Sequence, residues 1–270
     1  MPSAEKSTAG DDALTICSIS VIASMISTML HEGLGHAAIA LLTGAHSGTL
    51  STVAWSSDFE TRLIAAGGTL VNLAAALLFW LALRAARNTS ARVRFFLLIA
   101  MAFNLFTGTG YFFFSGVTNF GDWAQVIAGM HPYWLWRTML VVIGVAAYYC
   151  ALLVVGISLV HFLGVSPGDN ARIRRLMILP YLSALVLEGV AGCLNPIGLR
   201  LVFESALAAT AGANAGMLWI QYYIPKRTIP GPNHQPDHQT IRRNYAWIVV
   251  AGVLAIAFIF ILGRGIHLAA

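Results

Sequence analysis

Two histidines and a glutamate stand within six residues at the far end of the first long apolar segment, in the stretch His31-Glu32-Gly33-Leu34-Gly35-His36. A strongly polar side chain at bilayer depth costs roughly 3 kcal/mol or more, so such residues are functional candidates. Neutral imidazoles hold zinc, and a carboxylate beside them can take a proton from a water whose pKa the metal lowers to about 7. The motif therefore predicts metal-dependent hydrolysis, and the alternative is a buried polar cluster that joins helices.

The spacing of the two histidines decides whether they can share one ion. On a regular α-helix five residues advance roughly 500°, which leaves His31 and His36 about 140° apart around the axis. A π-bulge, whose hydrogen bonds run to i+5, would bring both rings to one face, and Gly33 and Gly35 would ease that distortion. In the alternative geometry Glu32 and His36 share a face and bind the metal. His31 would then contact one of these ligands without binding the metal, or would carry the proton. The sequence leaves both geometries open, and we expect the first.

Composition places the chain in the membrane class, because 58% of its 270 residues are hydrophobic and only 10% are charged. Apolar runs of about 18 residues or more can cross a hydrocarbon core about 30 Å thick. We therefore expect an all-α fold, a polytopic transmembrane helix bundle with about seven spans. These predicted spans are residues 13–45, 63–86, 95–116, 138–165, 176–195, 201–224 and 245–268.

Basic residues are unevenly divided between the two sets of connecting loops. The loops after the first, third and fifth spans hold only Arg62, Arg137 and Arg200, and Arg264 stands at the outer end of the last span. Since cytoplasmic loops carry the excess of Lys and Arg, we predict a multi-pass protein of the cell inner membrane with a cytoplasmic N-terminus and an external C-terminus. The net charge of +5 then reflects loops that face anionic lipid, so no nucleic-acid partner is expected. The cytoplasmic set comprises Arg84, Arg87, Arg92, Arg94, Arg172, Arg174, Arg175, Lys226, Arg227, Arg242 and Arg243.

Three sequence elements together resemble the site-2-protease type of intramembrane zinc metallopeptidase. The first is the histidine motif, followed by Ala37-Ala38-Ile39-Ala40 and Gly44, with an H-E-x-x-x-H spacing in place of H-E-x-x-H. The second, Gly68-Thr69-Leu70-Val71-Asn72, is similar to the family's Gly-Pro-x-x-Asn segment. The third is Asp122, in Asn119-Phe120-Gly121-Asp122-Trp123, the best candidate for the acid that completes the zinc site. The resemblance covers residues 1–125, a core of three spans, and residues 126–270 add further helices of unknown role to the same bundle.

The resemblance implies a zinc-dependent protease that cuts peptide bonds in or near the membrane. His31, His36 and Asp122 would bind Zn²⁺, and Glu32 would act as the general base. Asn72 would contact the substrate or an oxyanion, although hydrogen bonding between helices is the commoner role of a membrane asparagine. The expected partners are membrane lipids and a transmembrane peptide substrate.

The predicted topology brings the histidine motif and Asp122 to the same side of the membrane. The first and third predicted spans both run outward, so His31 and His36 lie near the external end of one and Asp122 lies just past the end of the other. The intervening loop, residues 46–62, has the alternation of a strand or hairpin. The aromatic run 111–114 fits an interfacial belt, and no role in the site is expected for it.

Two further acids, Glu188 and Glu204, fall inside predicted spans and must face inward as ligands, proton-relay groups or partners of Arg200. They leave two other functions open beside a protease. One is a metal-dependent membrane enzyme that acts on a lipid or another amphiphile through the same site. The other is a non-enzymatic transporter or assembly factor, in which these acids form a proton or ion path with His31 and Glu32.

Overall fold

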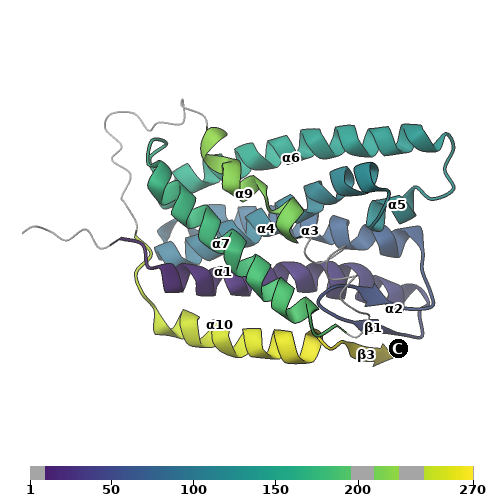
Figure 1. Cartoon of the computed structure of the whole chain (residues 1–270). Coiled ribbons are helices and arrows are strands. Elements are labelled where there is room, and N and C mark those ends of the chain that lie inside the picture. Colours follow the sequence, from purple (N-terminus) through teal and green to yellow (C-terminus); the bar gives the residue numbers. More distant parts are fainter. Residues whose placement is uncertain (1–9, 196–209, 225–239, 270) are drawn as a thin grey trace, which may run out of the picture.

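The computed structural model describes residues 10–195, 210–224 and 240–269, and within them the chain forms a helical bundle with one small sheet (Figure 1). Six helices are long and apolar enough to cross a membrane, so the predicted all-α polytopic bundle is confirmed. The protein is therefore a multi-pass membrane protein. The six spans are Ala13–Thr43, Arg62–Asn88, Ala91–Thr118, Tyr133–Leu163, Asn170–Gly192 and Tyr245–Leu262.

The predicted span 201–224 differs from the other six. Residues 201–209 lie outside the described residues, together with Glu204 and Arg200. The described remainder, residues 210–224, contains a π-helical turn at residues 210–213 and the short helices α9 (Gly216–Trp219) and η4 (Ile220–Tyr222). Gly212 and Gly216 fall within this part, and each glycine disfavours a helix by about 1 kcal/mol relative to alanine.

The first span consists of three helices in series, and the middle one is not an α-helix. Asp12 caps α1 (Ala13–Thr28) by accepting a hydrogen bond from the Thr15 backbone N–H at 2.9 Å. The chain then continues as the π-helix η1 (Met29–Ala38) and ends as α2 (Ile39–Thr43). The histidine motif thus lies wholly within the π-helix.

The third span, helix α4 (Ala91–Thr118), occupies the centre of the bundle. Its side chains Phe95, Phe103 and Phe106 are fully buried, and it packs against both α3 and α6. By contrast, α10 lies on the outside, where Val249 and Val253 are more than 60% exposed, as suits side chains that face lipid. The remaining helices are α3 (Arg62–Ala85), η2 (Ala86–Asn88), α4 (Ala91–Thr118), α5 (Asp122–Val126), α6 (Tyr133–Leu163), α7 (Asn170–Gly192), α10 (Tyr245–Ala257) and the π-helix η6 (Phe258–Leu262).

A small antiparallel sheet, in the order β2-β1-β3, covers the end of the bundle next to the histidine motif (Figure 1). β1 (Ser47–Leu50) and β2 (Trp55–Ser56) form the hairpin predicted between the first two spans. β3 (Ile266–Ala269) pairs with β1, and the predicted helix 245–268 was wrong over these last residues. Gly265, whose φ of 83° favours glycine, turns the chain from the helix into the strand.

Contacts at both ends fix the direction of the last helix. The segment before α10 contacts the start of α1, where Arg243 pairs with Asp12 and the Asn244 N–H donates to Thr15 Oγ1 at 3.1 Å. After η6 the chain joins β1, beyond the end of the first span. The start of α1 and the strand β3 therefore lie at opposite ends of the bundle.

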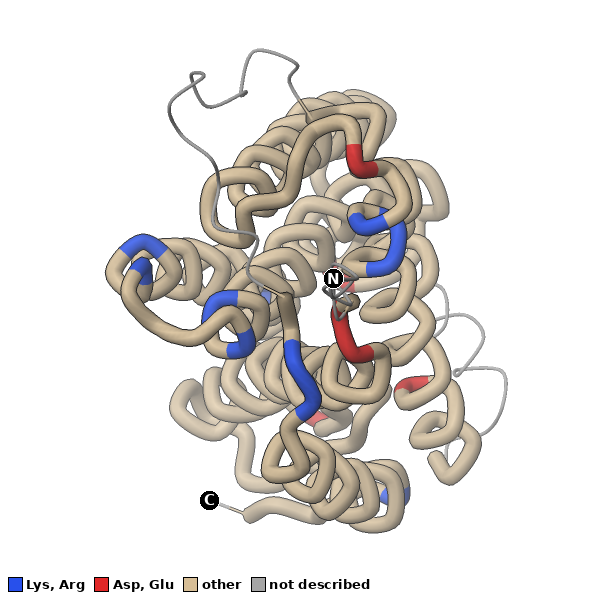
Figure 2. Tube along the Cα trace, turned by 90° about the vertical axis from the view of Figure 1, so that its left-hand side faces the viewer, with Lys and Arg blue, Asp and Glu red and all other residues tan. Residues whose placement is uncertain are grey.

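Basic residues gather at the end of the bundle where α1 begins, which faces the viewer in Figure 2. Two ion pairs hold helices together there: Asp11 with Arg172 at 2.7 Å, and Asp12 with Arg243 at 3.0 Å. The metal-site motifs lie toward the other end. The arginines near the start of α1 are Arg84, Arg87, Arg92, Arg94, Arg172, Arg174, Arg175, Arg242 and Arg243.

Candidate metal centre

The π-helix η1 brings the two histidines of the motif to the same face. Hydrogen bonds in a π-helix run from i to i+5, which is the separation of His31 and His36. Their ring centroids are 4.8 Å apart, and the residues are only 4% and 8% exposed. The distortion that the spacing predicted is confirmed, and it extends over ten residues rather than over the two glycines alone.

Asp122 reaches the histidines from a tight turn between α4 and α5. Asn119 ends α4 in the left-handed region, with φ of 59°, and Gly121 follows with φ of 83°. The Arg137 guanidinium holds the end of α4 by donating to the Gly116 carbonyl at 3.0 Å. This turn makes Asp122 the first residue of α5, aimed at η1.

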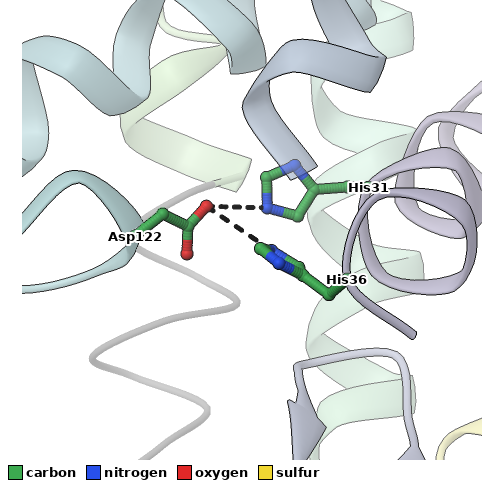
Figure 3. Close-up of side chains that lie close together, drawn as sticks. All are labelled: His31, His36 and Asp122. Carbon is green, nitrogen blue, oxygen red and sulfur yellow. Dashed lines mark ion pairs between the residues drawn. The ribbon is translucent and has the colours of Figure 1, made fainter. Parts of the chain in front are cut away.

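The three side chains converge on one point (Figure 3). Asp122 Oδ2 lies 3.2 Å from His31 Nε2 and 3.5 Å from His36 Nε2, and all three ligand atoms lie within 4.8 Å of one another. Neighbouring ligand atoms of a tetrahedral zinc ion with bonds of about 2.0–2.2 Å are about 3.3–3.6 Å apart. The two distances from Asp122 lie close to this spacing, so the group could hold a metal ion.

Hydrogen bonds on the far side of each ring set the tautomers. His31 Nδ1 contacts Asn72 Oδ1, and His36 Nδ1 lies 2.7 Å from the Ile64 carbonyl. Since both partners are acceptors, each Nδ1 carries the proton and each Nε2 presents a lone pair. Among the described residues, His31 Nε2 and Asp122 Oδ2 are buried without a hydrogen-bond partner. The three side chains thus form a group that could hold a metal ion.

The electrostatics of Asp122 suit a ligand. Burial by itself would raise the pKa of the Asp122 carboxyl. Without a bound ion the imidazoles of His31 and His36 can donate to it from Nε2, and these contacts more than offset burial and hold the pKa below its usual value. The carboxyl is therefore ionised, as a carboxylate ligand has to be.

Glu32 lies between the two histidines in η1 but is not part of the three-residue group. Its Oε2 accepts a hydrogen bond from the Trp55 N–H at 2.9 Å, so the hairpin fixes the carboxylate. Together with His36, Asp122 and Tyr111 it lines a cleft of about 420 Å³. The group able to hold an ion within the described residues is His31, His36 and Asp122, so the structure favours two histidine ligands over the Glu32–His36 alternative.

Glycines let η1 and α3 approach closely enough to form the site. A Cβ at Gly35 would lie 2.7 Å from the Gly68 nitrogen, so this glycine serves close packing. A Cβ at Gly68 would lie 2.5 Å from His36 Nε2 and 2.6 Å from His31 Nε2, so the absence of a side chain at Gly68 leaves room for the two rings. Gly33 has open space, since its nearest neighbour would be Leu50 Cδ2 at 3.8 Å.

Asn72 has a different environment from the substrate or oxyanion contact predicted for it. It is fully buried, its Oδ1 faces His31, and its Nδ2 donates to Asn104 Oδ1 at 2.7 Å and to the Ser27 carbonyl at 3.3 Å. Such bonds orient a ligand ring rather than a substrate.

Tyr111, for which no role in the site was expected, lies against His31 with ring centroids 4.9 Å apart, and it lines the cleft. It stands two helical turns after Asn104, so the two share a face of α4. That periodicity is the sequence signal that could have placed Tyr111 in the site.

Comparisons with models of protein families, with curated proteins and with solved structures find no match to this chain. The resemblance to site-2 proteases thus rests on the three sequence elements. The structure brings residues of all three together: both histidines from the first, Gly68 and Asn72 from the second, and Asp122 from the third.

Proposed function

We propose that this protein is a membrane-embedded zinc metalloprotease of the site-2-protease type that hydrolyses peptide bonds in or near the bilayer. The observation that carries the proposal is the convergence of His31 Nε2, His36 Nε2 and Asp122 Oδ2 on one point, where His31 Nε2 and Asp122 Oδ2 are buried without a hydrogen-bond partner among the described residues. A carboxylate that is not a ligand, Glu32, lies beside them in a cleft large enough for a segment of peptide. This combination is what a metal-dependent hydrolase requires.

Each residue has a defined part in the proposed reaction. His31, His36 and Asp122 would hold Zn²⁺, which supplies Lewis acidity and lowers the pKa of water. The Glu32 carboxylate takes the proton from the attacking water and delivers it to the nitrogen of the leaving amine. Trp55 holds Glu32 through its backbone N–H, and Asn72 fixes the ring of His31. A transmembrane peptide would bind in the cleft that Glu32 lines.

The direct test is to purify the protein in detergent and measure zinc and peptidase activity together. We expect about one zinc per chain, cleavage of apolar peptides, loss of cleavage with a chelator and recovery with added zinc. A purified, folded protein that neither contains nor takes up zinc would contradict the proposal. Zinc without peptide cleavage would contradict the protease and leave a different metal-dependent reaction.

One observation favours that second function, a metal-dependent enzyme acting on a lipid or another amphiphile. A cavity of about 510 Å³ with mainly apolar walls lies between α4 and α6, and Tyr111 lines both this cavity and the cleft. A hydrocarbon chain in the cavity would place a polar head near the metal centre. Release of fatty acid or another lipid fragment by the zinc-loaded protein, without peptide cleavage, would identify this function.

We further propose that the protein lies in the cell inner membrane with the start of α1 on the cytoplasmic side and the metal centre toward the external side. The arginines at the α1 end of the bundle support this orientation (Figure 2). It can be tested in a variant without the three native cysteines Cys17, Cys150 and Cys193. An impermeant thiol reagent should label Ser56→Cys in intact cells, and Arg87→Cys only after permeabilisation. The reverse pattern would place the metal centre on the cytoplasmic side.

A further inference from the structure

A third, smaller cavity lies beside the candidate metal centre and connects it to a helix outside the three-span core. It has a volume of about 50 Å³, with His31 and Glu32 on one side and Glu188 of α7 on the other. Most of the remaining wall is hydroxyl and amide side chains, among them Ser24, Thr28, Thr52 and Asn214. We refer to this cavity as the polar chamber. One water needs about 10–15 Å³ of such volume, so the polar chamber has room for about three to five waters.

Glu188 is a buried acid that the proposed reaction has not used. It is 3% exposed, and its Oε1 accepts hydrogen bonds from Ser24 Oγ at 3.0 Å and Thr28 Oγ1 at 2.8 Å. Within residues 10–195, 210–224 and 240–269, no cationic side chain pairs with it. A carboxyl group at this depth needs more polar partners than two hydroxyls.

Two other walls of the polar chamber carry atoms without a protein partner. Asn214 Oδ1 and Thr52 Oγ1 are buried, on residues that are each 4% exposed, and neither forms a hydrogen bond with the described part of the chain. Buried polar atoms in native proteins are almost always bonded to protein or to ordered water. Both atoms belong to the wall that also contains Glu188 and Glu32. The missing partners are therefore small, polar and inside the polar chamber.

We propose that the polar chamber binds a cluster of ordered waters that joins Glu188 to Glu32, and that Glu188 is the positioning residue for this cluster. Its role in catalysis rests on the proposed function, because water is the co-substrate of hydrolysis. The proposal gives α7 and the segment around Asn214 a part in the site, although both lie outside residues 1–125. The binding of water itself does not depend on which reaction the protein catalyses.

Radiolytic hydroxyl-radical footprinting tests the water cluster, because radicals formed on a bound water oxidise the side chains beside it. Three buried phenylalanines of α4 provide an internal comparison: Phe103 lines the polar chamber, whereas Phe95 and Phe106 are fully buried elsewhere. We expect Phe103 to be oxidised at least about ten times faster than the other two in the intact protein. Asn214→Leu, which fills the chamber, should bring Phe103 down to their rate. Equal rates for all three in the unmodified protein would overturn the proposal.

A kinetic experiment tests the role of Glu188. Glu188→Gln keeps an acceptor for Ser24 and Thr28, so zinc content and KM should remain unchanged while kcat falls about tenfold. Asp58→Asn, at an exposed acid in the loop after β2, should leave kcat unaltered. An unchanged kcat in Glu188→Gln would overturn the positioning role. Absence of peptidase activity in the unmodified protein would contradict the proposed function, while the footprint would still decide whether the chamber holds water.

Discussion

Glu32→Gln should retain zinc and lose peptide hydrolysis, whereas His31→Ala, His36→Ala or Asp122→Ala should lose the zinc itself. Glutamine keeps the size of Glu32 and an acceptor oxygen for the Trp55 N–H, but it cannot take a proton from water. General acid–base catalysis contributes about 10²–10⁴-fold, so kcat should fall within that range. Removal of a ligand leaves two, which rarely hold zinc at working concentrations. Metal analysis and peptide cleavage on the same preparations measure both effects.

Two outcomes would contradict this assignment in different ways. If Glu32→Gln loses zinc while His31→Ala retains it, Glu32 and His36 are the ligands and the base is another residue. If every variant retains both zinc and activity, the reaction occurs elsewhere in the chain. Asp58→Asn serves as the matched control, because Asp58 is an exposed acid with no contact to the three ligands.

The sequence predicted six membrane helices and the meeting of the histidine motif with Asp122 at one end of the bundle, because both follow from hydropathy and chain direction. It also predicted a π-bulge or a break in the helix at the histidine motif, where the structure has a π-helix of ten residues. That prediction needed only the five-residue separation and the requirement that His31 and His36 face one ion. Local periodicity was sufficient for each of these features.

The sequence could not decide the ligand set, because that choice depends on contacts with α3. Asn72 and the Ile64 carbonyl orient the rings of His31 and His36. Both residues belong to α3, and local periodicity does not show which residues of α3 contact the first span. For the same reason Asn72 was given a substrate role when its amide is occupied by Asn104 and Ser27.

Other differences between prediction and structure occur in segments whose composition is compatible with two different structures. Residues 266–269 are apolar enough to continue α10, yet they form β3 because Gly265 turns the chain and β1 offers a partner. An aromatic residue near a helix end is typical of an interfacial belt, so its position in the sequence did not indicate that Tyr111 contacts His31. In both cases a partner distant in the sequence determines the outcome.

Gly68→Ala should abolish zinc binding without altering a ligand. The new methyl carbon would lie 2.5 Å from His36 Nε2 and 2.6 Å from His31 Nε2, well inside van der Waals contact, so it would displace the rings or the ion. Changes behind a ligand usually cost 10–100-fold in metal affinity, and a methyl group in the site itself should cost at least about 100-fold. The fold should survive, because alanine favours a helix over glycine by about 1 kcal/mol. Zinc titration together with the melting temperature of the zinc-free protein separates the two effects.

The matched control is Gly33→Ala, within the histidine motif itself. A methyl group there meets only Leu50 Cδ2 at 3.8 Å, so zinc affinity should stay within a fewfold of that of the unmodified protein. If glycine serves the site by making the π-helix flexible, both substitutions should weaken zinc binding. If it serves by leaving space where α3 passes beneath the two imidazoles, only Gly68→Ala should do so. Full zinc occupancy in Gly68→Ala would mean that the ion does not lie between the Nε2 atoms and Asp122, and the three-ligand site would have to be abandoned.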